Sequence, residues 1–180
     1  MLERFKVPEE DQIRIGHDAL TATVQSILEK MGCPSEDAAE GANTLVTTDL
    51  RGVETHGVSN MLRYYVDEFQ SGKMNPRPDV KVIRETPGTV TLDGDRGLGV
   101  IVAPGAMRRA IEKAKNVGVG IAVMQNSGHM GAVGHHAMLA ARENMVGMAT
   151  TSGGAGKRVF VLPTFAAEPR LGTNPISIAA

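Results

Sequence analysis

The sequence predicts an α/β protein in which a helical N-terminal segment, residues 1–75, precedes the first part of an α/β domain, residues 76–180. Three observations predict this class. Apolar residues recur at helical spacing in the first third of the chain, two alternating stretches then flank a Pro-Gly pair, and helical and extended patterns alternate from there to the end. The 21 glycines and the 3 % aromatic content indicate a core of small and aliphatic side chains with close backbone packing.

The N-terminal segment contains three expected helices. Apolar residues at helical spacing predict the first over residues 8–31, and a Gly and a Pro just beyond it end the pattern. The second is expected over residues 35–50, with Ser35 as its N-cap and acidic residues in the first turn, where they suit the helix dipole. The third is expected over residues 55–69, with one apolar face made of Val58, Met61, Leu62, Tyr65 and Phe69.

The α/β part begins with two strands, 80–85 and 89–94, which alternate apolar and polar residues and are joined by a turn at Pro87-Gly88. The next helix is expected to end at Gly118, which suits a C-cap. The elements expected after the two strands are a helix over 103–118, a buried strand over 120–127, a helix over 131–145, a strand over 146–152 and a last strand over 174–180.

Composition and charge exclude several classes of function. A net charge of −1 argues against a surface for nucleic acid or anionic membranes. The chain has no apolar run of transmembrane length, and its charged N-terminus lacks the apolar centre of a signal peptide. A single cysteine, Cys33, excludes an internal disulfide and fits a reducing compartment, so we expect a cytoplasmic protein. Because the sequence stops within the apolar stretch of LGTNPISIAA, we also expect either the first part of a longer protein or one chain of a two-chain assembly.

Two phosphate-binding patterns fail in this sequence. A Walker loop requires Ser or Thr after Gly-Lys, whereas Gly156-Lys157 is followed by Arg158. A Rossmann loop requires a third glycine three residues after Gly-x-Gly, whereas Gly118-Val119-Gly120 is followed there by Val123. The stretch GGAGKR, residues 153–158, is therefore either a cationic loop that binds an anion or an ordinary surface loop.

The stretch NSGHMGAVGHHA places three of the five histidines within eight residues. A metal site is disfavoured, because His135 and His136 point about 100° apart on a helix and no cysteine or carboxylate lies shortly before His129. His129 follows a predicted strand and His56 stands at the start of a predicted helix, so each could exchange protons with a ligand or simply occupy a loop and cap a helix. The residues alone leave both interpretations open.

Three segments carry a family resemblance. RGVETHGVSNMLRYYV, NSGHMGAVGHHAMLAARENMVGMATTSGG and LGTNPISIAA resemble the malate/L-lactate dehydrogenase type 2 family, which includes ureidoglycolate, sulfolactate and diketogulonate dehydrogenases and cyclic imine carboxylate reductases. The motifs R-G-x-x-[ST]-H-G, G-H-x-G-A and G-T-N-P are specific in this order, and the likeness runs from about residue 10 to the end. It corresponds to the first half of a family member.

The resemblance implies a non-Rossmann NAD(P)-binding fold with a mixed or largely antiparallel sheet, incomplete in this chain. It implies an enzyme that transfers hydride between NAD or NADP and a small 2-hydroxy acid or 2-keto acid. His129 would then be the acid/base, and His56 would line the pocket and contact the substrate. It also implies a homodimer of the complete protein, whose C-terminal half belongs to the same or a second chain. The remaining implied residues are Thr55, Asn60, Arg63 and Tyr64 for the substrate, and His129, Gly131, Ala132, Ser152, Gly172, Thr173, Asn174 and Pro175 for the cofactor.

The sequence departs from the family pattern at two positions. Many members have Arg four residues after the THG histidine, where this chain has Asn60; Arg63, one turn further, is an alternative grip on a carboxylate. Ser152-Gly153 stands where members have an Asn-Ser pair. Two alternatives therefore stay open: a cyclic imine carboxylate reductase, and a non-catalytic partner subunit of the same fold.

The choice between NAD and NADP is also open. A 2′-phosphate requires a nearby cation, and Lys157, Arg158 and Arg170 are the candidates.

Overall fold

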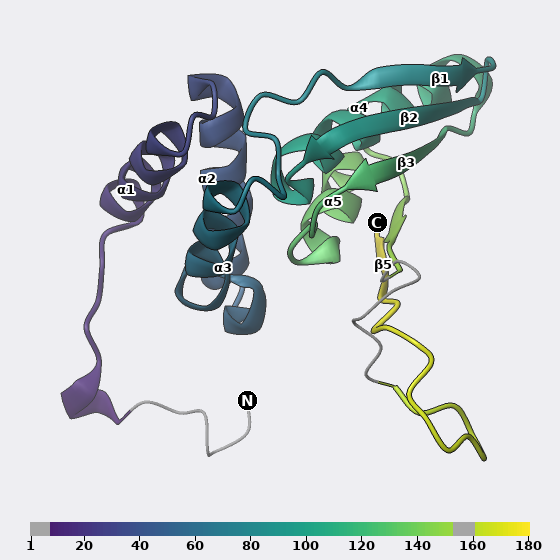
Figure 1. The fold of residues 1–180 in the computed structure, drawn as a ribbon. Coiled ribbons are helices and arrows are strands. Elements are labelled where there is room, and N and C mark those ends of the chain that lie inside the picture. The colour runs from purple at the N-terminus through teal and green to yellow at the C-terminus, as the bar shows by residue number, and fades with distance from the viewer. Residues whose placement is uncertain (1–7, 153–160) are drawn as a thin grey trace.

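The computed structural model describes residues 8–152 and 161–180. It has an α/β fold with two parts that lie side by side (Figure 1). Helices α1 (His17–Lys30), α2 (Ser35–Leu50) and α3 (Val58–Gln70) form one part. The other part comprises β1 (Lys81–Glu85), β2 (Thr89–Gly97), α4 (Gly99–Val117), β3 (Ile121–Ser127), α5 (Val133–Ala141), β4 (Gly147–Thr150) and β5 (Ile176–Ala179).

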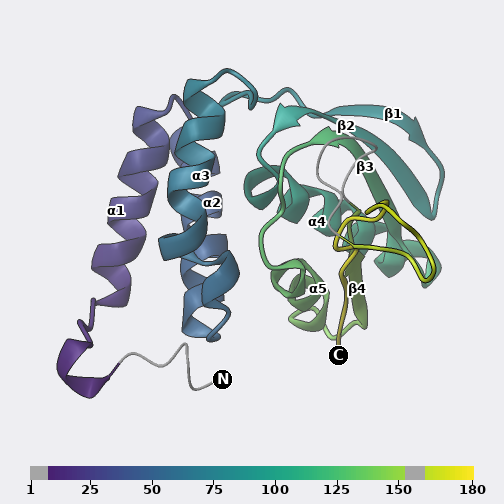
Figure 2. The ribbon, with the colours of Figure 1, turned by 60° about the horizontal axis from the view of Figure 1, so that its bottom comes forward.

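The sheets combine parallel and antiparallel pairs. Strands β1 and β2 pair antiparallel, β2 and β3 pair parallel across the α4 connection, and β4 pairs antiparallel with β5 in a separate two-stranded sheet. Helix α4 packs on β2 and β3 of the three-stranded sheet, whereas α5 packs on α4 and on the β4–β5 pair (Figure 2). The expected mixed, non-Rossmann α/β architecture is therefore confirmed.

The first helix is shorter than predicted. Residues Glu9–Asp11 form only a 3₁₀ turn, and α1 begins at His17, after Gly16 in extended conformation. Ile13 and Ile15 match helical spacing, yet 88 % and 63 % of their surfaces are exposed. Because these exposed side chains do not pack against a core that would stabilise a helix, their helical spacing did not lead to one.

Helix α2 has the predicted bounds, but its first residue acts differently from the prediction. Pro34 occupies the N-cap position, and no side chain caps the helix. The Ser35 hydroxyl instead donates to the Glu29 carboxylate at 2.8 Å, which ties the start of α2 to the end of α1. The predicted cap at Ser35 is therefore wrong.

Helix α4 starts at Gly99, four residues before the predicted start, and contains Pro104. A proline has no N–H, so it cannot bond the carbonyl of Val100 four residues earlier. The Thr44 hydroxyl from α2 lies 3.1 Å from that carbonyl oxygen and 3.0 Å from the Glu40 carbonyl oxygen of its own helix, so the two carbonyls share its one proton. The neighbouring helix thus offers a donor to the carbonyl that the proline leaves unpaired within α4. Gly118 ends α4 with a φ of 85°, as predicted for a C-cap.

The main core lies where α1, α2 and α3 meet the first turn of α4. It continues across the boundary between residues 75 and 76, and that division into domains stays a prediction. The buried members of this core are Val24, Leu28, Cys33, Ala38, Ala42, Leu45, Val46, Tyr65, Phe69, Leu98, Val100, Ile101 and Val102.

Strand β3 was predicted to be buried, and this prediction is wrong for the described residues. Ile121 and Val123 are 51 % and 56 % exposed. The strand stands last in the order β1-β2-β3, and α4 covers one face of the sheet. A short apolar stretch is compatible with an edge strand as well as with a central strand, so the sequence pattern could not predict the position of β3 in the sheet.

Helix α5 is shorter than predicted at both ends. Gly131, with a φ of 67°, and Ala132 precede it in non-helical conformation, and Asn144 has a φ of 59° beyond its end. Among the described residues, no helix is both long enough and apolar enough to cross a membrane.

Candidate active site

The Tyr65 hydroxyl holds His129 in place. His129 lies in the short loop between β3 and α5, and its Nδ1 is 2.8 Å from the Tyr65 Oη on α3. Tyr65 is completely buried, whereas His129 is exposed. The backbone N–H of Gly131 points at the same nitrogen from 3.3 Å. One edge of the imidazole is thereby fixed to the protein, and the residue as a whole faces solvent.

His56 stacks on His129. The two ring centroids are 5.6 Å apart, with an angle of 17° between the ring planes. His56 belongs to the 3₁₀ turn Glu54–His56 before α3, and its Nδ1 lies 2.8 Å from the Thr55 hydroxyl. The Tyr64 ring meets His129 edge-on, with centroids 6.5 Å apart. The structure thus brings together Thr55, His56, Tyr64 and His129, which the sequence had assigned to one site.

A carboxylate from α2 positions the THG segment. Asp49 accepts the backbone N–H of Val58, the first residue of α3, at 2.9 Å and so caps that helix from outside. Gly57 is required beside it, because a Cβ there would lie 1.6 Å from the Asp49 Oδ1. Burial raises the pKa of Asp49, the hydrogen bond from Val58 lowers it, and Glu54 raises it. The start of α3, and with it His56, is held against α2.

Close backbone packing brings the His129 loop onto α4. A Cβ on Gly99 would lie 2.4 Å from the carbonyl oxygen of Gly128 and 2.7 Å from the carbonyl carbon of His129. A Cβ on Gly131 would lie 2.8 Å from the Val100 side chain. Side chains at these glycines would push the loop away from α3, so the contact between His129 and Tyr65 requires their absence.

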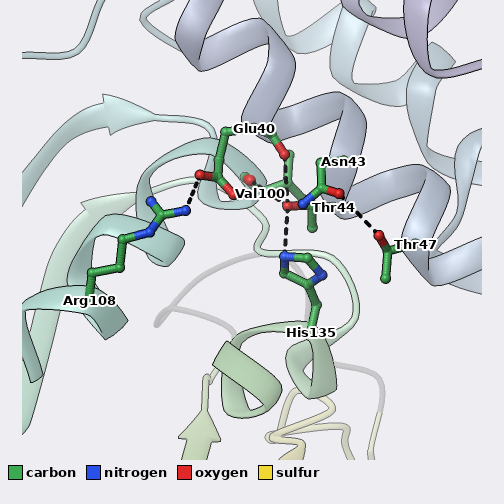
Figure 3. Close-up of polar contacts among 7 residues, drawn as sticks. All are labelled: Glu40, Asn43, Thr44, Thr47, Val100, Arg108 and His135. Atoms are coloured by element: carbon green, nitrogen blue, oxygen red, sulfur yellow. Dashed lines mark hydrogen bonds and ion pairs between the residues drawn. The ribbon is translucent and has the colours of Figure 1, made fainter. Parts of the chain in front are cut away.

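The other two histidines of the segment are buried in α5. His135 is 3 % exposed, and its Nε2 lies 3.4 Å from the Thr44 hydroxyl (Figure 3). Since Thr44 gives its one proton to a carbonyl, its oxygen accepts from Nε2–H. His136 is 1 % exposed, and its Nε2 donates to the carbonyl of Met130 at 2.7 Å. Met130 directly follows His129 in the chain.

Burial keeps both of these imidazoles neutral. Burial is the main cause that lowers the pKa of His135 to about 4, and the neighbouring His136, Arg142 and Arg108 lower it further. Burial also lowers the pKa of His136, while the hydrogen bond to Met130 acts in the opposite direction. These two histidines therefore hold the helix and the loop in place. No group of three or more His, Cys, Asp or Glu side chains in residues 8–152 and 161–180 is arranged to hold a metal ion.

The two remaining residues assigned to the substrate differ in their surroundings. Asn60 donates its amide N–H to the Glu54 carbonyl at 2.8 Å, so the amide secures the turn that carries His56. Arg63 is an exposed residue of α3, one turn further along the helix.

The residues assigned to the cofactor gather at one end of the β4–β5 pair. Thr150 pairs with Ile176, and the Thr150 hydroxyl donates to the Pro175 carbonyl at 2.9 Å. Ser152 therefore follows β4 where the segment Gly172–Pro175 enters β5. The first turn of α5 lies beside this end, since a Cβ on Gly134 would be 3.4 Å from the Ser177 hydroxyl. No side chain caps α5, and Gly131 and Ala132 lead into it.

Of the three candidate cations for a 2′-phosphate, Arg170 lies within the described residues. Arg170 pairs with Glu168 at 2.7 Å. Lys157 and Arg158, together with the rest of the GGAGKR stretch, lie outside the residues that the structure describes.

Sequence reasoning missed Tyr65 as a member of the site and assigned it to the apolar face of its helix. A signal for it did exist. A phenol on a buried apolar face still needs a hydrogen-bond partner, and a polar loop residue is the partner to look for. Asp49 and Thr44 were missed as well, and for them the sequence offered no comparable sign.

The fold and the site define a class of α/β proteins distinct from the doubly wound dinucleotide-binding folds. A helical layer meets a mixed sheet, and a histidine in the loop after strand β3 is held by a tyrosine of helix α3. Within that class the chain belongs to the malate/L-lactate dehydrogenase family, whose model matches residues 15–180.

Curated relatives agree with this membership. The chain is 45 % identical over 172 residues to a malate dehydrogenase of Pyrococcus abyssi, covering 96 % of this chain and 46 % of the relative. It is 40 % identical over 153 residues to an L-sulfolactate dehydrogenase of Methanocaldococcus jannaschii, covering 85 % and 43 %. The chain thus spans about half the length of the curated relatives it matches.

Solved structures show the same relationship. The malate dehydrogenase of Pyrococcus horikoshii superposes with a TM-score of 0.91 at 45 % identity, over 100 % of this chain and 50 % of that one. The sulfolactate dehydrogenase of M. jannaschii superposes with a TM-score of 0.86 at 37 % identity, over 92 % and 47 %.

Proposed function

We propose that this chain carries the proton-transfer site of an NAD(P)-dependent oxidoreductase that interconverts a small 2-hydroxy acid and its 2-keto acid. The observation that carries the proposal is the Tyr65 hydroxyl 2.8 Å from Nδ1 of the exposed His129, with His56 stacked on the same ring. An imidazole anchored through one nitrogen presents the other in a defined direction, as a general acid or base requires. The malate and L-sulfolactate dehydrogenases among the relatives act on 2-hydroxy acids, which supports this substrate class.

Each residue of the cluster has a distinct role in this proposal. His129 gives a proton from Nε2 to the carbonyl oxygen during reduction and takes it back during oxidation. His56 and Tyr64 form the walls that orient the substrate against His129. The amide of Asn60 is engaged by Glu54, so Arg63 is the residue assigned to the substrate carboxylate, which a guanidinium can grip with two hydrogen bonds.

The residues at the end of the β4–β5 pair suit a dinucleotide. The first turn of α5 has no side-chain cap and so offers backbone N–H groups to a phosphate. Ser152 and the segment Gly172–Pro175 would complete this side of the cofactor site. When bound there, the nicotinamide would supply or accept the hydride.

The substrate pocket is completed by polypeptide beyond this chain. Two surface hollows of about 570 and 320 Å³ lie along α4, and neither is lined by His56 or His129. Since the chain spans about half the length of its relatives, the counterpart of their remaining half is the source of the missing wall. The complete enzyme is expected to be a homodimer.

The test is His129→Gln in the natively purified protein, with intact mass recorded to identify any second polypeptide. NADH and NADPH oxidation are followed against a panel of 2-keto acids and cyclic imine carboxylates. Loss of a general acid lowers kcat about 10²- to 10⁴-fold while the circular dichroism spectrum stays the same. His17→Gln, at the exposed start of α1, is the control and keeps full turnover. Unchanged kcat in His129→Gln would contradict the assigned role, and no turnover by the wild-type protein with both halves present would favour the non-catalytic subunit.

A further inference from the structure

We propose that Tyr65 is a positioning residue that works in two directions: its hydroxyl donates to Nδ1 of His129 when that nitrogen is bare and accepts from it when that nitrogen is protonated. The proposal rests on the proton-transfer role given above to His129. It concerns a different residue and a different nitrogen, and it assigns to Tyr65 control over the protonation state from which His129 acts.

The geometry at Nδ1 carries the argument. Two groups of the described residues contact this nitrogen: the Tyr65 Oη at 2.8 Å and the Gly131 backbone N at 3.3 Å. A backbone N–H can only donate, whereas a phenol can donate or accept. Both groups suit a bare Nδ1. Of the two, only the Tyr65 hydroxyl can accept a hydrogen bond from a protonated Nδ1. The Gly131 N–H can only donate, so it disfavours a proton on that nitrogen.

The reaction requires the state that Gly131 opposes. In reduction, the carbonyl carbon gains a hydride from the nicotinamide, the Nε2–H bond of imidazolium His129 breaks, and an O–H bond forms on the new alcohol. The neutral imidazole that remains keeps its other proton on Nδ1. In oxidation, the same form must be present at the start, with Nε2 bare to accept the alcohol proton. Every productive form therefore has Nδ1–H, which needs an acceptor.

Tyr65 is suited to reorient its proton without losing it. Burial, with a smaller contribution from Tyr64, raises the pKa of Tyr65 well above its ordinary value, so the phenol stays neutral throughout. Its side chain is fixed by the core around α3, and the absence of a side chain at Gly131 keeps the His129 loop within reach of it. Rotation about the C–O bond is the one change needed when His129 gains or loses a proton.

Among the described residues, the titratable side chains whose rings lie beside the His129 ring are His56 from the 3₁₀ turn and Tyr64 and Tyr65 from α3. The Tyr65→Phe comparison leaves His56 and Tyr64 unchanged, so a difference between the two titrations reports on the Tyr65 hydroxyl.

The experiment compares the wild-type protein with Tyr65→Phe, which removes the hydroxyl and keeps the ring. The ¹⁵N signals of the His129 imidazole are followed by NMR across pH. Without its acceptor, the Nδ1–H of the cation loses a charge-assisted hydrogen bond, so the titration midpoint moves about one pH unit lower, a tenfold change in proton affinity. Turnover of Tyr65→Phe at neutral pH falls about 10- to 100-fold in kcat with a much smaller change in KM. Tyr64→Phe is the matched comparison, and there the change falls on KM while the titration midpoint stays in place.

Two outcomes overturn the proposal. The first is a His129 titration with the same midpoint in Tyr65→Phe and the wild type. The second, which needs no variant and so survives a Tyr65→Phe protein that does not fold, is a wild-type spectrum above the midpoint in which neutral His129 carries its proton on Nδ1 in the absence of ligand. Because both are read without catalysis, a protein that shows no turnover but gives the expected titrations refutes the proposed reaction and leaves the role of Tyr65 standing.

Discussion

Acidification is expected to destabilise this protein through His135. The imidazole is 3 % exposed, lies between α5 and α2, and can gain a proton in the folded state only at an Nδ1 that has no hydrogen-bond partner within the described residues. Its pKa is lowered to about 4, first by burial and then by the positive charges around it. In the unfolded chain the same group titrates near 6.5.

The size of the effect follows from the difference between these two values. Between pH 6.5 and pH 4 the unfolded chain binds a proton at His135 that the folded protein does not bind. The contribution of neutral His135 to the free energy of unfolding is therefore fully present above pH 6.5 and is lost as the pH falls. At about 1.4 kcal/mol per pKa unit, His135 removes about 2 kcal/mol of the free energy of unfolding at pH 5 and about 3 kcal/mol at pH 4.

Urea denaturation at pH 7.5 and pH 5.0 measures this difference. His135→Gln keeps an amide N–H near the position of Nε2 and does not titrate, so its stability is expected to fall by about 2 kcal/mol less than that of the wild type. The comparison between the two proteins cancels the carboxylates and His136, which titrate in both. His17→Gln, which removes a histidine exposed in the folded protein, is expected to follow the wild type. If His135→Gln loses as much stability as the wild type between the two pH values, the reasoning from burial is refuted.

Two further substitutions test the packing that positions the site, each with a control. Gly99→Ala places a Cβ 2.4 Å from a backbone oxygen of the loop after β3, so the free energy of unfolding is expected to fall by about 1–3 kcal/mol and kcat to fall with it. Gly105→Ala, in the same helix with open space around its Cβ, is expected to keep full activity and to gain up to about 1 kcal/mol; equal losses in the two variants would contradict the steric argument. Thr44→Val leaves the buried Val100 carbonyl without a donor and is expected to cost about 1–3 kcal/mol in urea denaturation. Thr23→Val removes a similar hydroxyl from the exposed face of α1, where the change should stay within about 0.5 kcal/mol, and a comparable loss there would show that burial is not the cause.

The sequence predicted elements where local chemistry decides the structure. Helix α2 has the predicted bounds, because a Pro before it and an Arg-Gly pair after it limit the helix whatever packs against it. The end of α4 at Gly118 follows in the same way from the positive φ that glycine permits. The start of α1 and the exposure of β3 depend instead on which surfaces the rest of the protein covers, and no local pattern contains that information.

In the candidate site, too, some features follow from local sequence and others depend on how the elements pack together. The family motifs assigned His56 and His129 to one site, and in the structure their rings stack. The choice between Tyr64 and Tyr65 could not be made from the sequence, because neighbouring residues on a helix point about 100° apart. Both rings lie beside His129, at centroid distances of 6.5 Å for Tyr64 and 6.0 Å for Tyr65, and the rotation of α3 against the loop places the Tyr65 hydroxyl at Nδ1.

The three clustered histidines have different roles because their hydrogen-bond partners differ. The Thr44 hydroxyl directs its one proton to backbone carbonyls, those of Glu40 at 3.0 Å and Val100 at 3.1 Å. The Thr44 oxygen can then only accept, so His135 must present Nε2–H to it and stays neutral. His136 is held in the same tautomer by the Met130 carbonyl. Both α5 imidazoles are thereby excluded from proton exchange near neutral pH, and His129, whose partner Tyr65 can donate or accept, is the histidine of the segment that can change its protonation state without losing a hydrogen bond.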